Sequence, residues 1–136
     1  MRLEAGLHDV EDFSPVKPGT YDFVIKDPME CVPVVDQKTD IGGKCWNFVI
    51  RPEVLGGELA GKKVRRQFGN RSKGSRYFLK SFLERIGVAV SKEGAFTSED
   101  LLGKRFRATV GERLGKDKDG NERMYADLDT ESVIKQ

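Results

Sequence analysis

The feature of this sequence with the clearest chemistry is a run of positive charge. Between Leu59 and Leu83 the chain has eight basic residues and no acidic one, and the remainder holds 16 basic and 22 acidic residues, a net charge of −6. Positive charge gathered in one segment of an otherwise acidic protein favours a polyanionic partner bound at one place. The candidates for phosphate contacts are Lys62, Lys63, Arg65, Arg66, Arg71, Lys73, Arg76 and Lys80.

Aromatic side chains near these charges are candidates for stacking on bases. Tyr77 lies inside the basic run, and Tyr125 accompanies Arg123 on the polar face of the last predicted strand. Aromatic platforms combined with cations that follow the backbone are typical of proteins that bind single-stranded nucleic acid. We therefore add Tyr77, Arg123 and Tyr125 to the candidate nucleic-acid-binding residues.

The segment 69–75 offers backbone amides and hydroxyls close to a predicted helix N-terminus, which suits a phosphate. A mobile basic loop is an equally good interpretation. Gly69 and Gly74 have the spacing of a nucleotide-binding P-loop, but Ser75-Arg76 stands where that motif needs Lys followed by Ser or Thr. The segment therefore does not indicate an ATPase.

Residues suited to catalysis or metal binding are few. His8 is the one histidine, and the two cysteines, Cys31 and Cys45, are predicted to be free thiols. The acidic segment 117–128 resembles a calcium loop in spacing, but Leu128 stands where a bidentate Glu belongs. The sequence predicts no enzyme, no cofactor and no metal site.

The elements that must position the basic run are mainly strands. Alternating and β-branched residues predict a first strand over 20–26 that continues through 31–35, a second over 44–51 and a third over 62–68. In the third strand Val64 and Phe68 are expected to face inward, and Arg66 breaks the alternation, which predicts a bulge or an early end.

A helix and two further strands follow. Ser75 is a predicted helix cap, Gly87 a predicted stop, and the apolar stripe between them is Phe78, Leu79, Phe82, Leu83 and Ile86. Alternation then predicts strands over 104–114 and 122–133, joined by a hairpin loop over 115–121. In the first of these strands the inward residues are Phe106, Ala108 and Val110, and the outward residues are Arg105, Arg107 and Thr109. This order predicts a mainly β domain over 16–136, a five-stranded Greek-key OB-fold barrel with one amphipathic helix between strands three and four, after an acidic N-terminal arm over 1–15.

Several of these segments also resemble a family of phage and prophage proteins found in replication and recombination modules. The resemblance lies in Pro18 to Tyr21, Trp46 to Phe48, Phe78 to Gly87, Glu99 to Lys104 and Asn121 to Asp129, and spans residues 16 to 134. It implies an oligonucleotide-binding fold that binds single-stranded DNA with little sequence preference. Bacterial single-strand binders carry an acidic tail with a hydrophobic tip, whereas this sequence ends Val133-Ile134-Lys135-Gln136.

Other readings of the same residues stay open. The main alternative is a protein-interaction module that docks a phage recombinase, helicase or nuclease, which the acidic arm with Leu3, Leu7 and Phe13 favours. RNA binding and self-association are equally open. No apolar run is long enough for a membrane span and no signal peptide is evident, so we expect a cytoplasmic protein, in the host cell if a phage encodes it, with no membrane partner.

Overall fold

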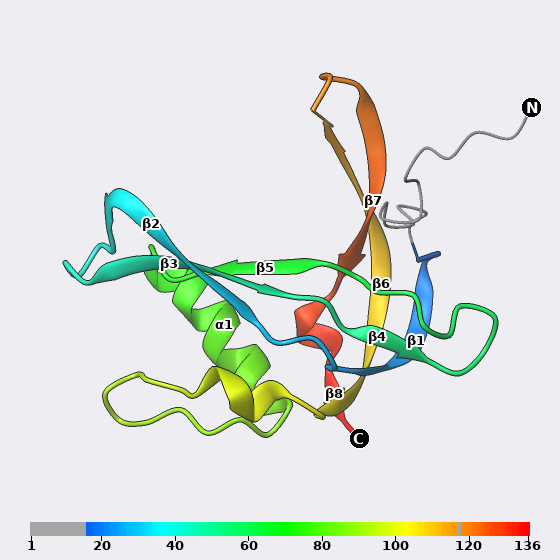
Figure 1. Ribbon diagram of the computed structural model, residues 1–136, viewed down its shortest axis with the longest axis horizontal. Coiled ribbons are helices and arrows are strands. Elements are labelled where there is room, and N and C mark those ends of the chain that lie inside the picture. The colour runs from blue at the N-terminus through cyan, green and yellow to red at the C-terminus, as the bar shows by residue number, and fades with distance from the viewer. Residues whose placement is uncertain (1–15, 117) are drawn as a thin grey trace, which may run out of the picture.

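The computed structural model describes residues 16–116 and 118–136, so the predicted arm over 1–15 and the loop residue Asp117 lie outside the described residues. The described chain is mainly β and folds into two antiparallel sheets (Figure 1). The first sheet contains β4 (Glu53–Leu55), β1 (Gly19–Val24), β6 (Arg105–Lys116) and β7 (Glu122–Leu128) in that order, with β8 (Ile134–Lys135) paired to β6. The second contains β2 (Glu30–Lys38), β3 (Lys44–Ile50) and β5 (Arg66–Gly69).

The predicted five-stranded OB-fold barrel is wrong. Within the described residues there are eight short strands, the two sheets do not close into a barrel, and the helix follows the fifth strand instead of the third. The four residues of β5 form backbone hydrogen bonds with β3 but do not pair with β7, so the second sheet ends at β5. Side chains meet across that gap instead, with Arg66 lying 3.9 Å from Asp127.

The additional strands have local causes. The predicted first strand is two strands, because β1 pairs with β4 and β6 whereas β2 pairs with β3 in the other sheet. Asp27-Pro28 lies between them, and proline lacks the amide that a continuous ladder needs. The unpredicted β4 is only three residues long and ends at Gly56 and Gly57, whose positive φ angles of 73° and 74° form the turn.

The α-helix α1 (Lys73–Arg85) begins earlier than the sequence predicted. Ser72, not Ser75, is the N-cap: the Ser72 hydroxyl accepts from the Ser75 amide at 3.1 Å, and Ser75 Oγ accepts from the Ser72 amide at 3.1 Å. This reciprocal pair is a capping box in which serine takes the place usually held by Glu or Gln. The predicted stop is confirmed, because Gly87 has a φ of 85° directly after the helix.

The core joins the two sheets through α1. Phe82 stacks on Phe68 of β5 with ring centroids 5.1 Å apart and meets Phe106 of β6 edge-on at 5.6 Å. Phe106 in turn stacks on Phe23 of β1 at 5.4 Å. Four of the five predicted stripe residues are buried, whereas Phe78 is 42% exposed.

Two 3-10 helices complete the described chain, η2 (Ser98–Leu101) and η3 (Thr130–Ser132). Leu101 of η2 is fully buried, whereas the next residue, Leu102, is 42% exposed. Between residues 16 and 136, Asp117 excepted, no helix combines the length and apolar character needed to cross a membrane.

Candidate nucleic-acid interface

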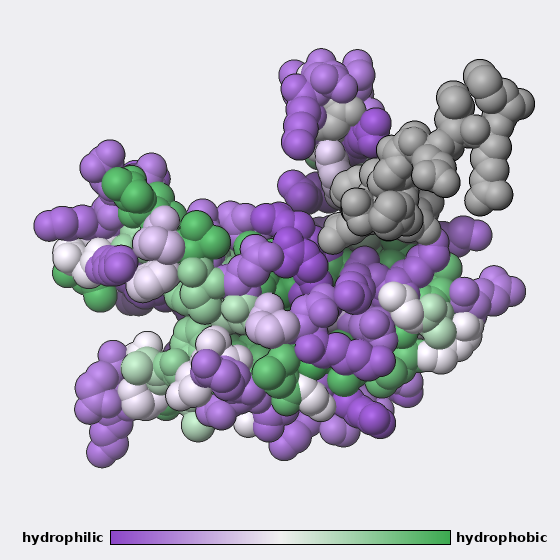
Figure 2. All heavy atoms as spheres, viewed as in Figure 1, coloured by the Kyte–Doolittle hydropathy of each residue, from purple (hydrophilic) through white to green (hydrophobic). Residues whose placement is uncertain are grey.

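Two hairpins diverge from the body of the protein and leave the outer face of β5 between them. In Figure 1 the β2–β3 hairpin projects to the left, the β6–β7 hairpin projects upward, and β5 runs across the base. Figure 2 shows hydrophilic side chains covering this region over β5. The arrangement leaves a broad polar surface in the angle between the hairpins.

At the foot of the β6–β7 hairpin this surface is hollowed into a depression of about 360 Å³. Side chains from three strands or their immediate neighbours line it, and we call this set the arginine groove. Its members are Arg65, Arg66, Gln67, Arg113, Ala126 and Asp127. Three guanidinium groups and one carboxylate give the lining a formal charge of +2, so an anion fits its chemistry.

The groove arginines are held in different ways. Arg65 donates to Gln67 Oε1 at 3.0 Å. Arg66 lies over the Phe68 ring at 5.1 Å, and its Nη1 is 3.9 Å from the Asp127 carboxylate, which is an ion-pair distance longer than a hydrogen bond. The Arg66 Nε is buried and has no hydrogen-bond partner among the described residues. The charge of Arg66 is therefore only loosely compensated.

The β6–β7 hairpin extends the groove outward with an aromatic ring. Arg113 and Tyr125 are cross-strand partners, and the guanidinium carbon lies 5.7 Å from the ring centroid. Gly115 leaves room for that ring, since a Cβ at this position would lie only 3.0 Å from Tyr125 Cε2. Arg123 pairs with Gly115, so Arg123, Tyr125 and Asp127 follow one face of β7.

Four of the predicted residues thus share one surface although they come from distant segments: Arg65, Arg66, Arg123 and Tyr125. The sequence prediction missed Arg113. The sequence did contain a pattern that points to Arg113. Arg105, Arg107 and Thr109 were expected to face outward, and the same alternation, continued four residues beyond Thr109, places Arg113 on that face.

Lys62 and Lys63 follow the turn after β4 and lie outside the groove. The Lys63 ammonium forms an ion pair with Asp27 at 2.9 Å, and the Lys63 backbone pairs with Glu53. The Lys62 carbonyl accepts from the Val54 amide at 2.8 Å. These two lysines therefore belong to the edge of the first sheet.

The remaining predicted residues surround the first turns of α1, and we call them the helix cluster: Arg71, Lys73, Arg76, Tyr77 and Lys80. Arg76 is bound to the tip of the β2–β3 hairpin, where its Nη1 lies 2.7 Å from Asp40 Oδ1. The Asp40 carboxylate also accepts from the Lys73 amide at 3.1 Å. The Arg76 guanidinium is the main cause that lowers the pKa of Asp40 below its usual value.

The amides that the sequence offered for a phosphate are already used at this helix N-terminus. Asp40 takes the Lys73 amide and the Ser72 hydroxyl takes the Ser75 amide. The loop before the helix is also tied to β3, because Asn70 Oδ1 accepts from the Trp46 amide at 2.8 Å. Contacts inside the protein therefore occupy the Lys73 and Ser75 amides, two of the groups that a phosphate bound at this N-terminus would use.

No protein-family model matches this sequence, and no curated protein matches it. Within the described part of the chain, no three His, Cys, Asp or Glu side chains are grouped so that they can hold a metal ion.

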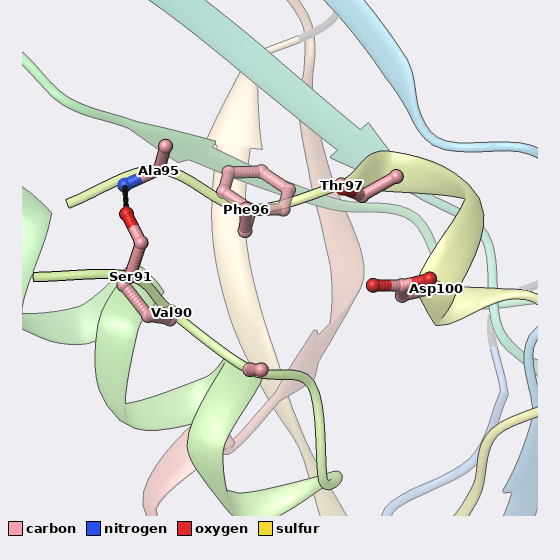
Figure 3. A pocket seen from close by; sticks show the side chains of 7 residues that line it. Val90, Ser91, Ala95, Phe96, Thr97 and Asp100 are labelled. Carbon is pink, nitrogen blue, oxygen red and sulfur yellow. Dashed lines mark hydrogen bonds between the residues drawn. The ribbon is translucent and has the colours of Figure 1, made fainter. Parts of the chain in front are cut away.

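A second hollow lies beside the segment between α1 and η2. It measures about 350 Å³ and is lined by Ala89, Val90, Ser91, Ala95, Phe96, Thr97 and Asp100. Figure 3 shows Ser91 Oγ accepting from the Ala95 amide, at 3.1 Å, and the Asp100 carboxylate pointing into the hollow. Its lining has a single charged group, the Asp100 carboxylate, so it does not suit an anionic ligand.

Proposed function

We propose that this protein binds single-stranded DNA with little sequence preference, in the replication or recombination of a phage and in the host cytoplasm. The observation that carries the proposal is the arginine groove, where Arg65 and Arg66 at the start of β5 and Arg113 of β6 lie around one carboxylate. Its continuation along the β6–β7 hairpin with Arg123 and Tyr125 supports a path for a strand longer than one nucleotide.

The chemistry of this surface favours binding without base selection. Guanidinium groups bind phosphate oxygens, which are the same in every sequence. The Tyr125 ring offers a flat surface, and every base has a face that can stack on it. Stacking of this kind needs bases that are free of a duplex, so we expect single strands to bind more tightly than double strands.

The first experiment measures binding by fluorescence anisotropy of labelled oligonucleotides at several salt concentrations. The oligonucleotides are single-stranded DNA, duplex DNA and single-stranded RNA of one length, short enough for one protein molecule. The variant Arg65→Ala/Arg113→Ala loses two phosphate contacts, and each contact contributes about 0.7 to the slope of log affinity against log salt concentration. We therefore expect its affinity for single-stranded DNA to fall by roughly 25-fold at 0.1 M salt.

A matched control removes the same charge elsewhere. Lys92→Ala/Arg105→Ala changes two exposed basic residues outside both the groove and the helix cluster, and we expect its affinity to change less than about twofold. Equal losses of affinity in the two double variants would mean that the groove contributes only general electrostatic attraction and is not the binding site. Tighter binding of RNA than of DNA would indicate that the ligand is RNA. No binding at low salt would contradict a nucleic-acid-binding function.

A further inference from the structure

The outward face of α1 carries an aromatic pair that the fold does not require. Tyr77 is 64% exposed and Phe78 is 42% exposed, and their rings meet edge-on with centroids 5.7 Å apart. The helix packs on the core through Leu79, Phe82 and Leu83 instead. Adjacent exposed aromatic rings on a helix are typical of a surface that binds a partner.

This face continues onto the β2–β3 hairpin. Asp40 at the hairpin tip contacts both the Lys73 amide and the Arg76 side chain of α1. The next residue, Ile41, is 78% exposed. The hairpin tip, with its exposed Ile41, is thus fixed to the first turn of the helix.

Positive charges surround the aromatic pair. Lys73, Tyr77 and Lys80 follow one another at helical spacing and lie on one stripe. Within residues 16–116 and 118–136, the one side-chain ion pair of this stripe joins Lys80 to Glu84, at 3.9 Å. Arg71, just before the helix, is exposed as well. A complementary partner combines carboxylates with apolar side chains.

The chain itself contains a segment with this composition, residues 1–15. Its acidic residues are Glu4, Asp9, Glu11 and Asp12, and its large apolar residues are Leu3, Leu7, Val10 and Phe13. We infer that residues 1–15 of a second copy of this chain bind the outward face of α1, with carboxylates on Lys73 and Lys80 and apolar side chains against Tyr77 and Phe78.

The position of Val16 favours a second copy over the same molecule. Val16 is buried in the core, and Gly19, three residues later, pairs with Val110 of β6. Figure 1 shows β1 toward one end of the long axis and the start of α1 toward the other. Because residues 1–15 join the fold at the β1 end and the basic face begins at the other end, we place this segment on the α1 of a neighbouring molecule.

Such docking links neighbouring copies into a chain, because each copy offers one acidic segment and one basic face. The docking does not depend on DNA. Its consequence, cooperative coating of a single strand, rests on the proposed function, since tethered neighbours raise the effective concentration of the next binding site.

The test is sedimentation velocity of the full chain without DNA over a range of protein concentrations. One variant, Lys73→Glu/Lys80→Glu, reverses the basic face, and a second, Asp9→Lys/Asp12→Lys, reverses the acidic segment. We expect the unmodified chain to self-associate and each variant alone to associate at least about tenfold more weakly, because like charges then face each other. An equimolar mixture of the two variants restores association.

The mixture separates this inference from a folding defect, because a misfolded variant cannot regain association by mixing. An unmodified chain that stays monomeric overturns the inference. Binding of residues 1–15 to the α1 of the same molecule would also give a monomer and would therefore overturn it as well. Association that survives both reversals also overturns it. Binding of one copy to a short oligonucleotide is measured separately, so failure here leaves the proposed function unaffected.

Discussion

The arginine groove and the helix cluster each have an arginine facing a carboxylate, yet the two regions differ in how closely these charges are paired. The groove gathers arginines from β5 and β6 around Asp127, which is 3.9 Å from Arg66. In the helix cluster, Arg76 lies 2.7 Å from Asp40, which also accepts from the Lys73 amide. The loosely paired charge remains available to a ligand, whereas the closely paired charge fixes the hairpin against the helix.

This difference shows that charge contiguous in sequence is not equivalent to charge gathered in space. The run of eight basic residues divides between the β4 edge, the groove and the helix. The groove gains Arg113, and its extension along the hairpin adds Arg123 and Tyr125, all from strands more than 40 residues away in the chain. The following predictions test whether the two regions differ in function as they do in structure.

The largest expected effect is on the free energy of unfolding, and it comes from the core residue that packs beneath both regions. Phe82 of α1 contacts both Phe68 and Phe106, so it joins the sheets on either side of the groove. Phe82→Ala should lower the free energy of unfolding by about 3–5 kcal/mol, because a buried ring leaves a cavity. Urea denaturation measures this loss.

Phe78→Ala is the matched control on the same helix, because Phe78 is 42% exposed whereas Phe82 is fully buried. Its free energy of unfolding should change by less than about 1 kcal/mol. Equal losses for the two phenylalanines would contradict the arrangement in which Phe82, and not Phe78, packs between the sheets and the helix.

The next effect separates the two tyrosines that the sequence proposed for stacking. Tyr125 lies over Gly115 beside Arg113 on the groove surface, whereas Tyr77 lies on the outward face of α1. Tyr125→Ala should weaken binding of a short single strand by about 1–3 kcal/mol, the range measured for loss of one stacked base. Fluorescence anisotropy gives the affinity.

Two further variants sharpen this comparison. Tyr125→Phe keeps the ring and should retain most of the affinity, and Tyr77→Ala should leave one-copy binding unchanged. A larger loss in Tyr77→Ala than in Tyr125→Ala would move the DNA path from the groove to the helix cluster.

The sequence predicted individual elements better than their assembly. The apolar stripe from Phe78 to Ile86 and the alternation of Phe106, Ala108 and Val110 are local patterns, and the structure confirms both except at Phe78, which is 42% exposed. The helix cap was misplaced by three residues because Ser72 and Ser75 both suit it, and only their reciprocal hydrogen bonds decide between them.

The predicted barrel failed for a different reason. Closure depends on whether β5 and β7 approach with matching backbone registers, and neither strand encodes the position of the other. In the structure their side chains meet instead, Arg66 with Asp127. The same gap contains the groove, so an accurate prediction of the site required the tertiary feature that the sequence pattern did not reveal.

A smaller effect on DNA affinity is expected when the one carboxylate of the groove, that of Asp127, is removed. Asp127→Asn removes the negative charge near Arg66 and raises the formal charge of the lining from +2 to +3. We expect affinity for a short single strand to rise about fivefold at 0.1 M salt, equivalent to one further phosphate contact. Titrations at several salt concentrations should also show a steeper salt dependence, and unchanged affinity would place the bound phosphates elsewhere.

The same substitution in the helix cluster should act on stability and not on DNA. Asp40 has a pKa below its usual value in the folded state, mainly through Arg76, so its ionised form favours folding. Asp40→Asn keeps an oxygen for the Lys73 amide but loses the charge facing Arg76. We expect a lower Tm at pH 7 and unchanged affinity for a short oligonucleotide.

The pH dependence gives the decisive readout for Asp40. A carboxyl whose folded pKa is depressed contributes stability above its unfolded pKa of about 3.9 and loses that contribution as pH falls through the folded value. The Tm difference between the unmodified chain and Asp40→Asn should therefore be constant from pH 7 to about 5 and shrink below about 4. Asp36→Asn, at an exposed position of the same hairpin, is the control. A difference that persists unchanged in acid would mean that the amide disturbs the hairpin tip through its shape, and that the ion pair with Arg76 does not stabilise the fold.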